Sequence, residues 1–193
     1  MTEPRGAERL VYFTDAVVAI AITLLVLPLV DAVGEAVDAR RSATEVVTDN
    51  ISQFFSFLLS FAVIARLWTA HHRLFDGVAT APGRVVGLNL LWLLTIVVLP
   101  FPTEMVGGYG EDRFTVVLYI GTILASSACL TALSVAIRGR LVGGAGSMTA
   151  LLALALLVAA FVPGVGYTAL LLLFLAPLVE RLWQRWRPGD WAA

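Results

Sequence analysis

The stretch RLVYFTDAVVAIAITLLVLPLVD, residues 9–31, decides the fold. No charged residue lies between Asp15 and Asp31 within it. An α-helix rises 1.5 Å per residue, so about 20 apolar residues cross a bilayer core of about 30 Å. The stretch therefore predicts a membrane-spanning helix with one carboxylate, Asp15, set inside one end.

On a helical wheel at about 100° per residue, this stretch has two different faces. One face carries aliphatic side chains with a hydroxyl at its edge and an acid at its far end: Ile20, Leu24, Leu27, Thr23 and Asp31. Thr14 and Asp15 lie on the other side, where they need partners in neighbouring helices. The aliphatic face suits either a pore lining or an ordinary surface toward lipid and other helices.

The composition places the whole chain in the membrane. Of its 193 residues, 59% are hydrophobic, which is more than a soluble domain hides. A single cysteine, Cys129, excludes an internal disulfide framework. We find no nucleophile–base pair, no metal-ligand spacing, no nucleotide motif and no basic run. The sequence thus gives no support for an enzyme, a metal centre or a nucleic-acid partner.

Six segments are apolar enough to span a bilayer, and glycine and proline pairs mark their connections. They are approximately residues 10–30, 51–71, 85–103, 114–137, 146–162 and 165–183. We therefore predict an all-α integral membrane protein with one six-helix domain over residues 1–193.

Arginine placement predicts the orientation. With a cytosolic N-terminus, ten of the 13 basic residues lie inside and only Arg40, Arg41 and Arg113 lie outside. Both termini are then cytosolic. The outer segments are net acidic, either because acids avoid the inner side or because they concentrate cations at an outer mouth.

Several polar residues are predicted at similar depth in the inner leaflet: Asp15, Trp68, His71, His72 and Asn89. A buried Asp15 carboxylate could accept a hydrogen bond from a histidine ring, the Trp68 indole or the Asn89 amide. Trp68 and His72 are four residues apart and share a helix face, which favours His72 over His71. The group is either inter-helix glue or a proton relay between Asp15 and a histidine.

Three serines, Ser52, Ser56 and Ser60, repeat every four residues in the second segment. Small residues at this spacing allow helices to approach closely, so we expect them at a packing surface.

These motifs resemble a known family. Arg9, Phe13, Thr14 and Asp15, followed by the AIAITLL run, resemble the R-x-x-x-F-S-D signature that opens the first helix of the transmembrane protein 175 potassium channels. Thr14 stands where that family has serine and keeps the hydroxyl. The segment WTAHHRLF, residues 68–75, resembles the end of the family's second helix, and Asn89 matches a polar position in its third.

The resemblance implies a homotetramer in which four first helices line a central pore without a T-V-G-Y-G filter. Rings of Ile20 and Leu27 would form its constrictions, with Thr23 as a hydroxyl layer between them and Leu24 beside them. Asp31 would attract cations at the outer mouth. The remaining motif residues would anchor the pore helix: Arg9, Phe13, Thr14, Asp15, Trp68, His71, His72 and Asn89.

We accordingly expect a potassium-selective channel in a bacterial plasma membrane that partners with its own copies, lipid and permeant K⁺, and uses no cofactor. A proton-coupled transporter using Asp15 and His72 is the main alternative. A membrane assembly subunit without transport activity is a third.

Overall fold

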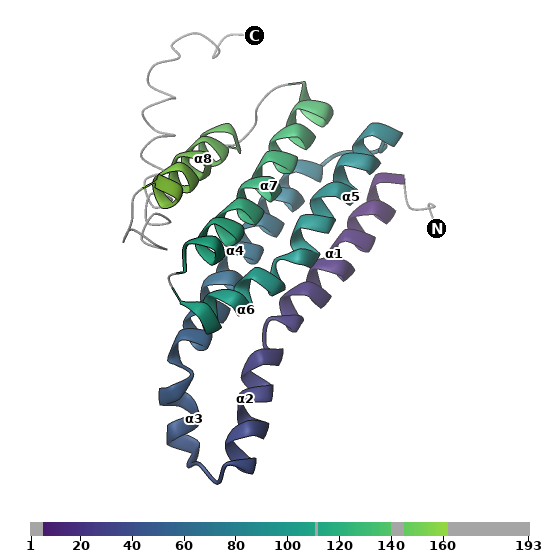
Figure 1. The fold of residues 1–193 in the computed structure, drawn as a ribbon. Coiled ribbons are helices and arrows are strands. Elements are labelled where there is room, and N and C mark those ends of the chain that lie inside the picture. Colours follow the sequence, from purple (N-terminus) through teal and green to yellow (C-terminus); the bar gives the residue numbers. More distant parts are fainter. Residues whose placement is uncertain (1–5, 111, 140–144, 162–193) are drawn as a thin grey trace.

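In a computed structural model, residues 6–110, 112–139 and 145–161 can be described, and their regular structure is α-helical throughout (Figure 1). The helices, in chain order, are α1 (Gly6–Leu24), α2 (Leu27–Asp38), α3 (Ala43–Asp49), α4 (Ile51–Phe75), α5 (Gly83–Val98), α6 (Pro100–Tyr109), α7 (Arg113–Arg138) and α8 (Ala145–Phe161). The predicted all-α class is confirmed for these residues.

Four helical stretches in this part of the chain are long and apolar enough to cross a membrane. They are Gly6–Asp38, Ile51–Phe75, Gly83–Tyr109 and Arg113–Arg138. The fifth predicted segment corresponds to a shorter apolar helix, Met148–Phe161. The sixth, residues 165–183, lies outside the described residues.

Two of these stretches are interrupted by proline, where the sequence predicts unbroken spans. Proline has no N–H and its ring clashes with the carbonyl four residues earlier, so a helix bends or restarts there. Pro28 lies in the first turn of α2, which restarts after the turn that ends α1 at Leu24. Pro100 begins α6 directly after α5 in the same way.

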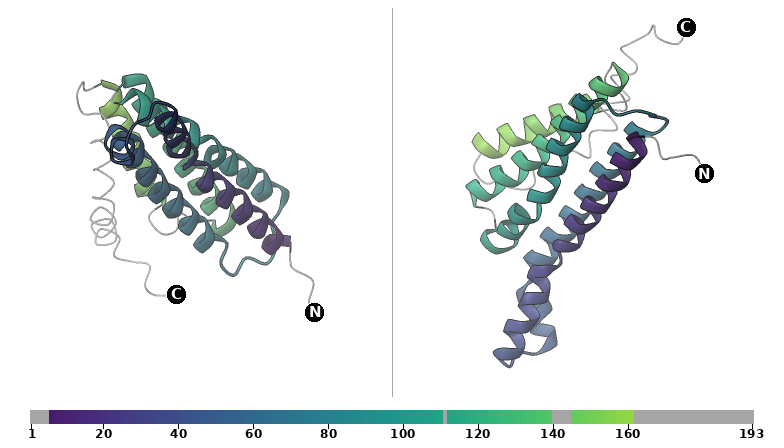
Figure 2. Two further views of the ribbon diagram at one scale, coloured as in Figure 1. Left: turned by 90° about the horizontal axis from the view of Figure 1, so that it is seen from below. Right: turned by 90° about the vertical axis from the view of Figure 1, so that its right-hand side faces the viewer.

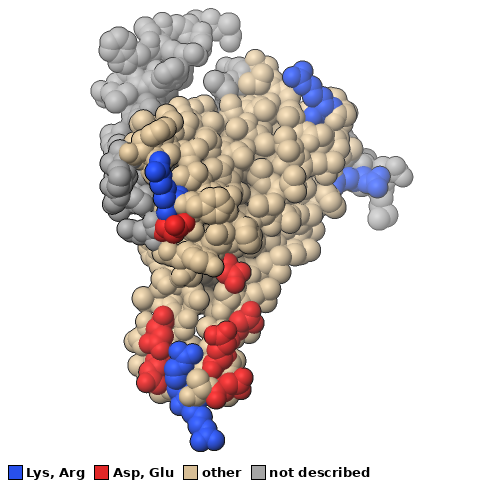
Figure 3. All heavy atoms as spheres, viewed as in Figure 1, with Lys and Arg blue, Asp and Glu red and all other residues tan. Residues whose placement is uncertain are grey.

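Residues 31–50, which lie between the first two predicted spans, form most of α2 and all of α3. This α2–α3 hairpin projects beyond the other helices (Figures 1 and 2). Charged side chains gather on it, whereas most of the bundle surface in the same view is uncharged (Figure 3).

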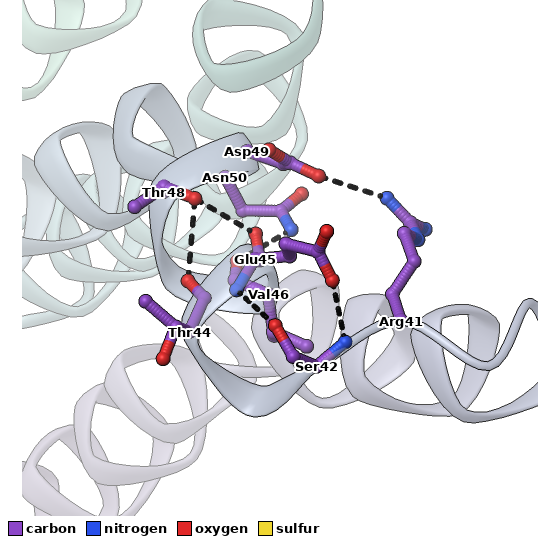
Figure 4. A network of polar contacts seen from close by, with 8 residues as sticks. All are labelled: Arg41, Ser42, Thr44, Glu45, Val46, Thr48, Asp49 and Asn50. Atoms are coloured by element: carbon purple, nitrogen blue, oxygen red, sulfur yellow. Dashed lines mark hydrogen bonds and ion pairs between the residues drawn. The ribbon is translucent and has the colours of Figure 1, made fainter.

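A capping box fixes the turn of this hairpin (Figure 4). The Ser42 backbone N–H donates to Glu45 Oε2 over 2.6 Å, and the Glu45 N–H donates to Ser42 Oγ over 3.3 Å. Two donors at the helix start are thereby satisfied. Arg41 also pairs with Asp49 at 3.3 Å across the hairpin.

The core lies between α4, α5, α6 and α7, and buried side chains of α1 and α8 contribute to it. Two of the three serines in the repeat of α4 bond across helices to α6 and α7, and the third, Ser56, bonds within α4. Ser52 Oγ donates to the Gly107 carbonyl over 2.8 Å. Ser60 Oγ lies 3.0 Å from the Tyr119 hydroxyl and accepts a hydrogen bond from Thr103 over 2.8 Å.

The helices α4 and α6 approach each other closely at Gly107. A Cβ placed there would lie 2.8 Å from Gln53 Cγ and 3.2 Å from Gln53 Cα. Because one neighbour is backbone, a side chain at this position would push the helices apart.

We predict that Gly107→Ala lowers the free energy of unfolding by about 1–3 kcal/mol, since overpacking in a tight contact costs that much. Gly108→Ala is the matched control, because a Cβ at Gly108 meets nothing within 4 Å. Thermal unfolding in detergent measures both. Equal stability of the two variants would contradict the close contact.

The hairpin should respond to acid. The hydrogen bond from the Ser42 backbone N–H, followed by the Ser42 hydroxyl contact, lowers the pKa of Glu45 below its ordinary 4.5. A lowered folded-state pKa stabilises the hairpin above pH 4.5, and this contribution is lost as the pH falls through the folded pKa. A ¹³C NMR titration of the Glu45 carboxyl should have its midpoint below 4.5 and should move upward in Ser42→Ala. An unchanged midpoint in Ser42→Ala would contradict the hydroxyl's contribution.

Candidate functional site

A buried chain of hydrogen bonds ties α1 to α5 and α4. The Asn89 amide nitrogen on α5 donates to Thr14 Oγ1 on α1 over 2.8 Å. Asn89 Oδ1 lies 2.6 Å from His71 Nε2 on α4. All three residues are fully buried. Burying a polar side chain in such surroundings is unfavourable unless it is hydrogen-bonded. This series of hydrogen bonds therefore fixes the position of α1.

The geometry also sets the protonation of His71. Asn89 Oδ1 can only accept, so His71 Nε2 carries the proton in this arrangement. Nδ1 has no hydrogen-bond partner among the described residues. The ring lies between Trp92 and Phe75, with centroid distances of 4.4 and 4.6 Å. A second proton on Nδ1 would bury an unpaired charge, so the site favours a neutral ring.

A second contact joins α1 to α4 on the surface side. Trp68 Nε1 donates to Asp15 Oδ1 over 2.7 Å. The His72 ring is tilted against Trp68 with centroids 5.6 Å apart, as expected for residues four apart on one face. This face is exposed, however, so His72 lies outside the buried chain.

The structure thus separates residues that the sequence grouped together. The preference for His72 differs from the structure, because turning Trp68 outward turns His72 outward and places His71 in the core. Asn89 bonds to Thr14, and Asp15 takes its hydrogen bond from Trp68. Sequence reasoning missed Trp92, although its place three residues after Asn89 puts both on one side of α5.

Two further motif residues lie away from these hydrogen bonds. Arg9 is exposed, and Phe13 is 53% exposed on the outer side of α1. Their predicted anchoring role therefore requires a contact beyond the described part of this chain.

The aliphatic face of α1 and α2 points away from the bundle. Ile20 is 61%, Leu24 is 40% and Leu27 is 49% exposed. Thr23 is exposed as well, and its hydroxyl donates to the Ile20 carbonyl over 2.8 Å. Asp31 continues this surface as an exposed acid in α2.

An apolar groove of about 420 Å³ lies elsewhere, between α5 and α7. Two threonines in its wall, Thr95 and Thr122, donate to carbonyls of their own helices. They therefore present little polarity to the groove. Among the described residues, no group of three or more histidine, cysteine, aspartate or glutamate side chains could hold a metal ion.

The fold and the anchored first helix define a multi-pass helical membrane protein. Comparisons with known proteins identify the proteins that it resembles. Residues 9–100 match the family model described as endosomal/lysosomal potassium channel TMEM175. A potassium channel of Streptomyces collinus is 35% identical over 102 residues, which is 52% of this chain and 48% of that protein. A potassium channel of Chamaesiphon minutus is 33% identical over 126 residues, which is 64% of this chain and 62% of that protein.

A solved structure extends the similarity. The crystal structure of a lysosomal potassium-selective channel TMEM175 homolog from Chamaesiphon minutus is 25% identical, with a TM-score of 0.69. The match covers 91% of this chain and 96% of that one. The chain is therefore similar to the TMEM175 channels over these matched regions, as its helix motifs predict. The aligned part spans about half to two-thirds of the length of the two curated relatives named above.

We predict that Thr14→Val lowers the free energy of unfolding by about 1–2 kcal/mol, because the buried Asn89 amide loses its acceptor. Thr122→Val is the matched control, since its hydroxyl bonds only within α7. The control should change stability by less than about 0.5 kcal/mol. Chemical unfolding monitored by tryptophan fluorescence compares the two, and equal losses would mean that the inter-helix bond contributes nothing.

Proposed function

We propose that this protein is a potassium-conducting channel, rather than an enzyme, in which copies of α1 surround a central pore. The observation that carries the proposal is the outward aliphatic face of α1, held in a fixed orientation by buried hydrogen bonds on its opposite side. The names of the related bacterial channels, and of the solved homologue, supply the permeant ion.

The burial of the spans supports an assembly of several copies. Only 28% of the most apolar part of the first span and 22% of that of the second are buried within the chain, against 39% and 44% for the third and fourth spans. The first span also carries the family motif. We infer that a homotetramer covers the rest of this surface, because one copy of α1 cannot enclose a pore.

The proposed conduction path uses three layers. Ile20 and Leu27 form aliphatic constrictions that block ions when dry and conduct when helix movement widens and wets them. An ion crossing such a ring is partly dehydrated, which favours K⁺ over Na⁺ because K⁺ loses water more easily. Thr23 donates its proton to the Ile20 carbonyl, so its oxygen keeps lone pairs that can face a cation. Leu24 lies beside these layers.

We also propose an orientation of the protein in the membrane. Six spans with both termini in the cytosol place the α2–α3 hairpin outside a bacterial plasma membrane. Asp31 and the other acids of the hairpin then raise the local cation concentration at the outer mouth. The permeant K⁺ is the only ion required, and no cofactor is needed.

We predict that Leu27→Asn changes the rate or selectivity of potassium flux, because an amide in the constriction lowers the cost of wetting it. Flux is measured from liposomes that hold the purified protein, with Na⁺ and N-methylglucamine gradients for comparison. Leu91→Asn on α5 is the matched control, since Leu91 is 51% exposed and Leu27 is 49% exposed. The control should conduct like the wild type.

Unchanged flux in a folded Leu27→Asn oligomer would remove α1 from the pore. Flux that requires a proton gradient, and is lost when Asp15 or His72 is replaced, would favour a proton-coupled transporter. Absence of any flux in the wild type would favour an assembly subunit.

A further inference from the structure

The helix α2 carries a second apolar face that the proposed pore does not use. Val30, Val33 and Val37 are 56%, 49% and 69% exposed, and Val26 just before the helix is 39% exposed. We call these four residues the valine face. At 100° per residue they fall within a sector of about 60°.

The other two sides of α2 are already accounted for. Ala32 and Ala36 are buried against the rest of the chain. The three acids, Asp31, Glu35 and Asp38, are all exposed and lie roughly 110–170° from the centre of the valine face. The helix therefore has an alanine side, an acidic side and an uncovered valine side.

Lipid does not explain the valine face. This part of α2 belongs to the hairpin that projects beyond the bundle (Figure 2) and on which the charged residues gather (Figure 3). An acid on nearly every turn keeps this part of the helix out of hydrocarbon, where charged side chains are costly. Val37 is thus a strongly exposed apolar side chain next to Asp38, in the aqueous part of the protein.

We propose that the valine face packs against the hairpin of a second copy of this chain, outside the membrane. The spacing between the valines is four, three and four residues, which is the pattern of apolar positions by which parallel helices pack together. Such contacts would leave the acidic side free to face water. The face also continues along the chain from the outward side of α1, where the proposed function places neighbouring copies.

This inference rests on the side-by-side assembly in the proposed function but not on ion conduction. The contact would join the hairpins into a collar that holds the copies together beyond the bilayer. It predicts that assembly depends on a surface that carries none of the pore residues.

Cross-linking of the full-length protein in liposomes tests the proposal. The single cysteine is removed by Cys129→Ala, and a benzophenone maleimide is attached at Val37→Cys. Benzophenone captures any nearby C–H bond on illumination, so the partner residue need not be known. Glu35→Cys, on the acidic side of the same helix, is the negative control. Ile20→Cys, on the outward face of α1, reports assembly within the membrane.

We expect a product of two chain masses from Val37 at several-fold higher yield than from Glu35. A two-chain product from Ile20, with only single chains from Val37 or with equal yields at Val37 and Glu35, would overturn this inference and leave the proposed assembly intact. Single chains from both Ile20 and Val37 would overturn the assembly itself.

Discussion

The rotation of α1 depends on the hydrogen bond between Thr14 and Asn89. Inside a membrane, lipid and protein are both apolar, so hydrophobicity alone does not decide which side of an apolar helix faces inward. A buried hydroxyl that must be paired removes this freedom. Once Thr14 is held by Asn89, which bonds in turn to His71, the side that carries Ile20 and Leu24 is turned away from the bundle. The Asp15–Trp68 bond adds a second point of attachment one residue further along.

The proline breaks extend this constraint to the other half of the molecule. A break frees carbonyl groups, which in a bilayer must find other donors. The Ile96 carbonyl, four residues before Pro100, accepts from the Leu99 N–H instead. Beside the break, the Thr103 hydroxyl lies 2.8 Å from both the Leu99 carbonyl and Ser60 Oγ on α4. The restart at Pro100 is thereby tied to the helix that also holds His71. The break before Pro28 has a different result, because it leads α2 into the projecting hairpin.

The sequence predicted the helical class and four of the membrane-capable stretches, because long apolar runs have few alternatives. It also identified Thr14, Asp15, Trp68 and Asn89 as polar groups that need partners. It could not pair them, since pairing depends on helix rotation and a uniformly apolar span has no periodic signal for it. The choice between His71 and His72 failed for this reason. The spacing of three between Ser42 and Glu45 is that of a capping box and indicates a helix start. The helices of the hairpin were nevertheless not predicted, because the segment is rich in charged residues.

The buried hydrogen bonds that fix α1 also suggest a role for its outward face. A helix side that meets only lipid can rotate with little penalty, because one fluid apolar contact is much like another. Burying three polar residues on three helices costs free energy, since each must be desolvated and paired. In contact with lipid alone, different orientations of the helix would differ little in energy. A fixed orientation is useful when specific side chains must face a specific place. A defined partner for the face of Ile20 and Leu27 would make use of this fixed orientation, and a ring of identical helices is one that the chain itself supplies.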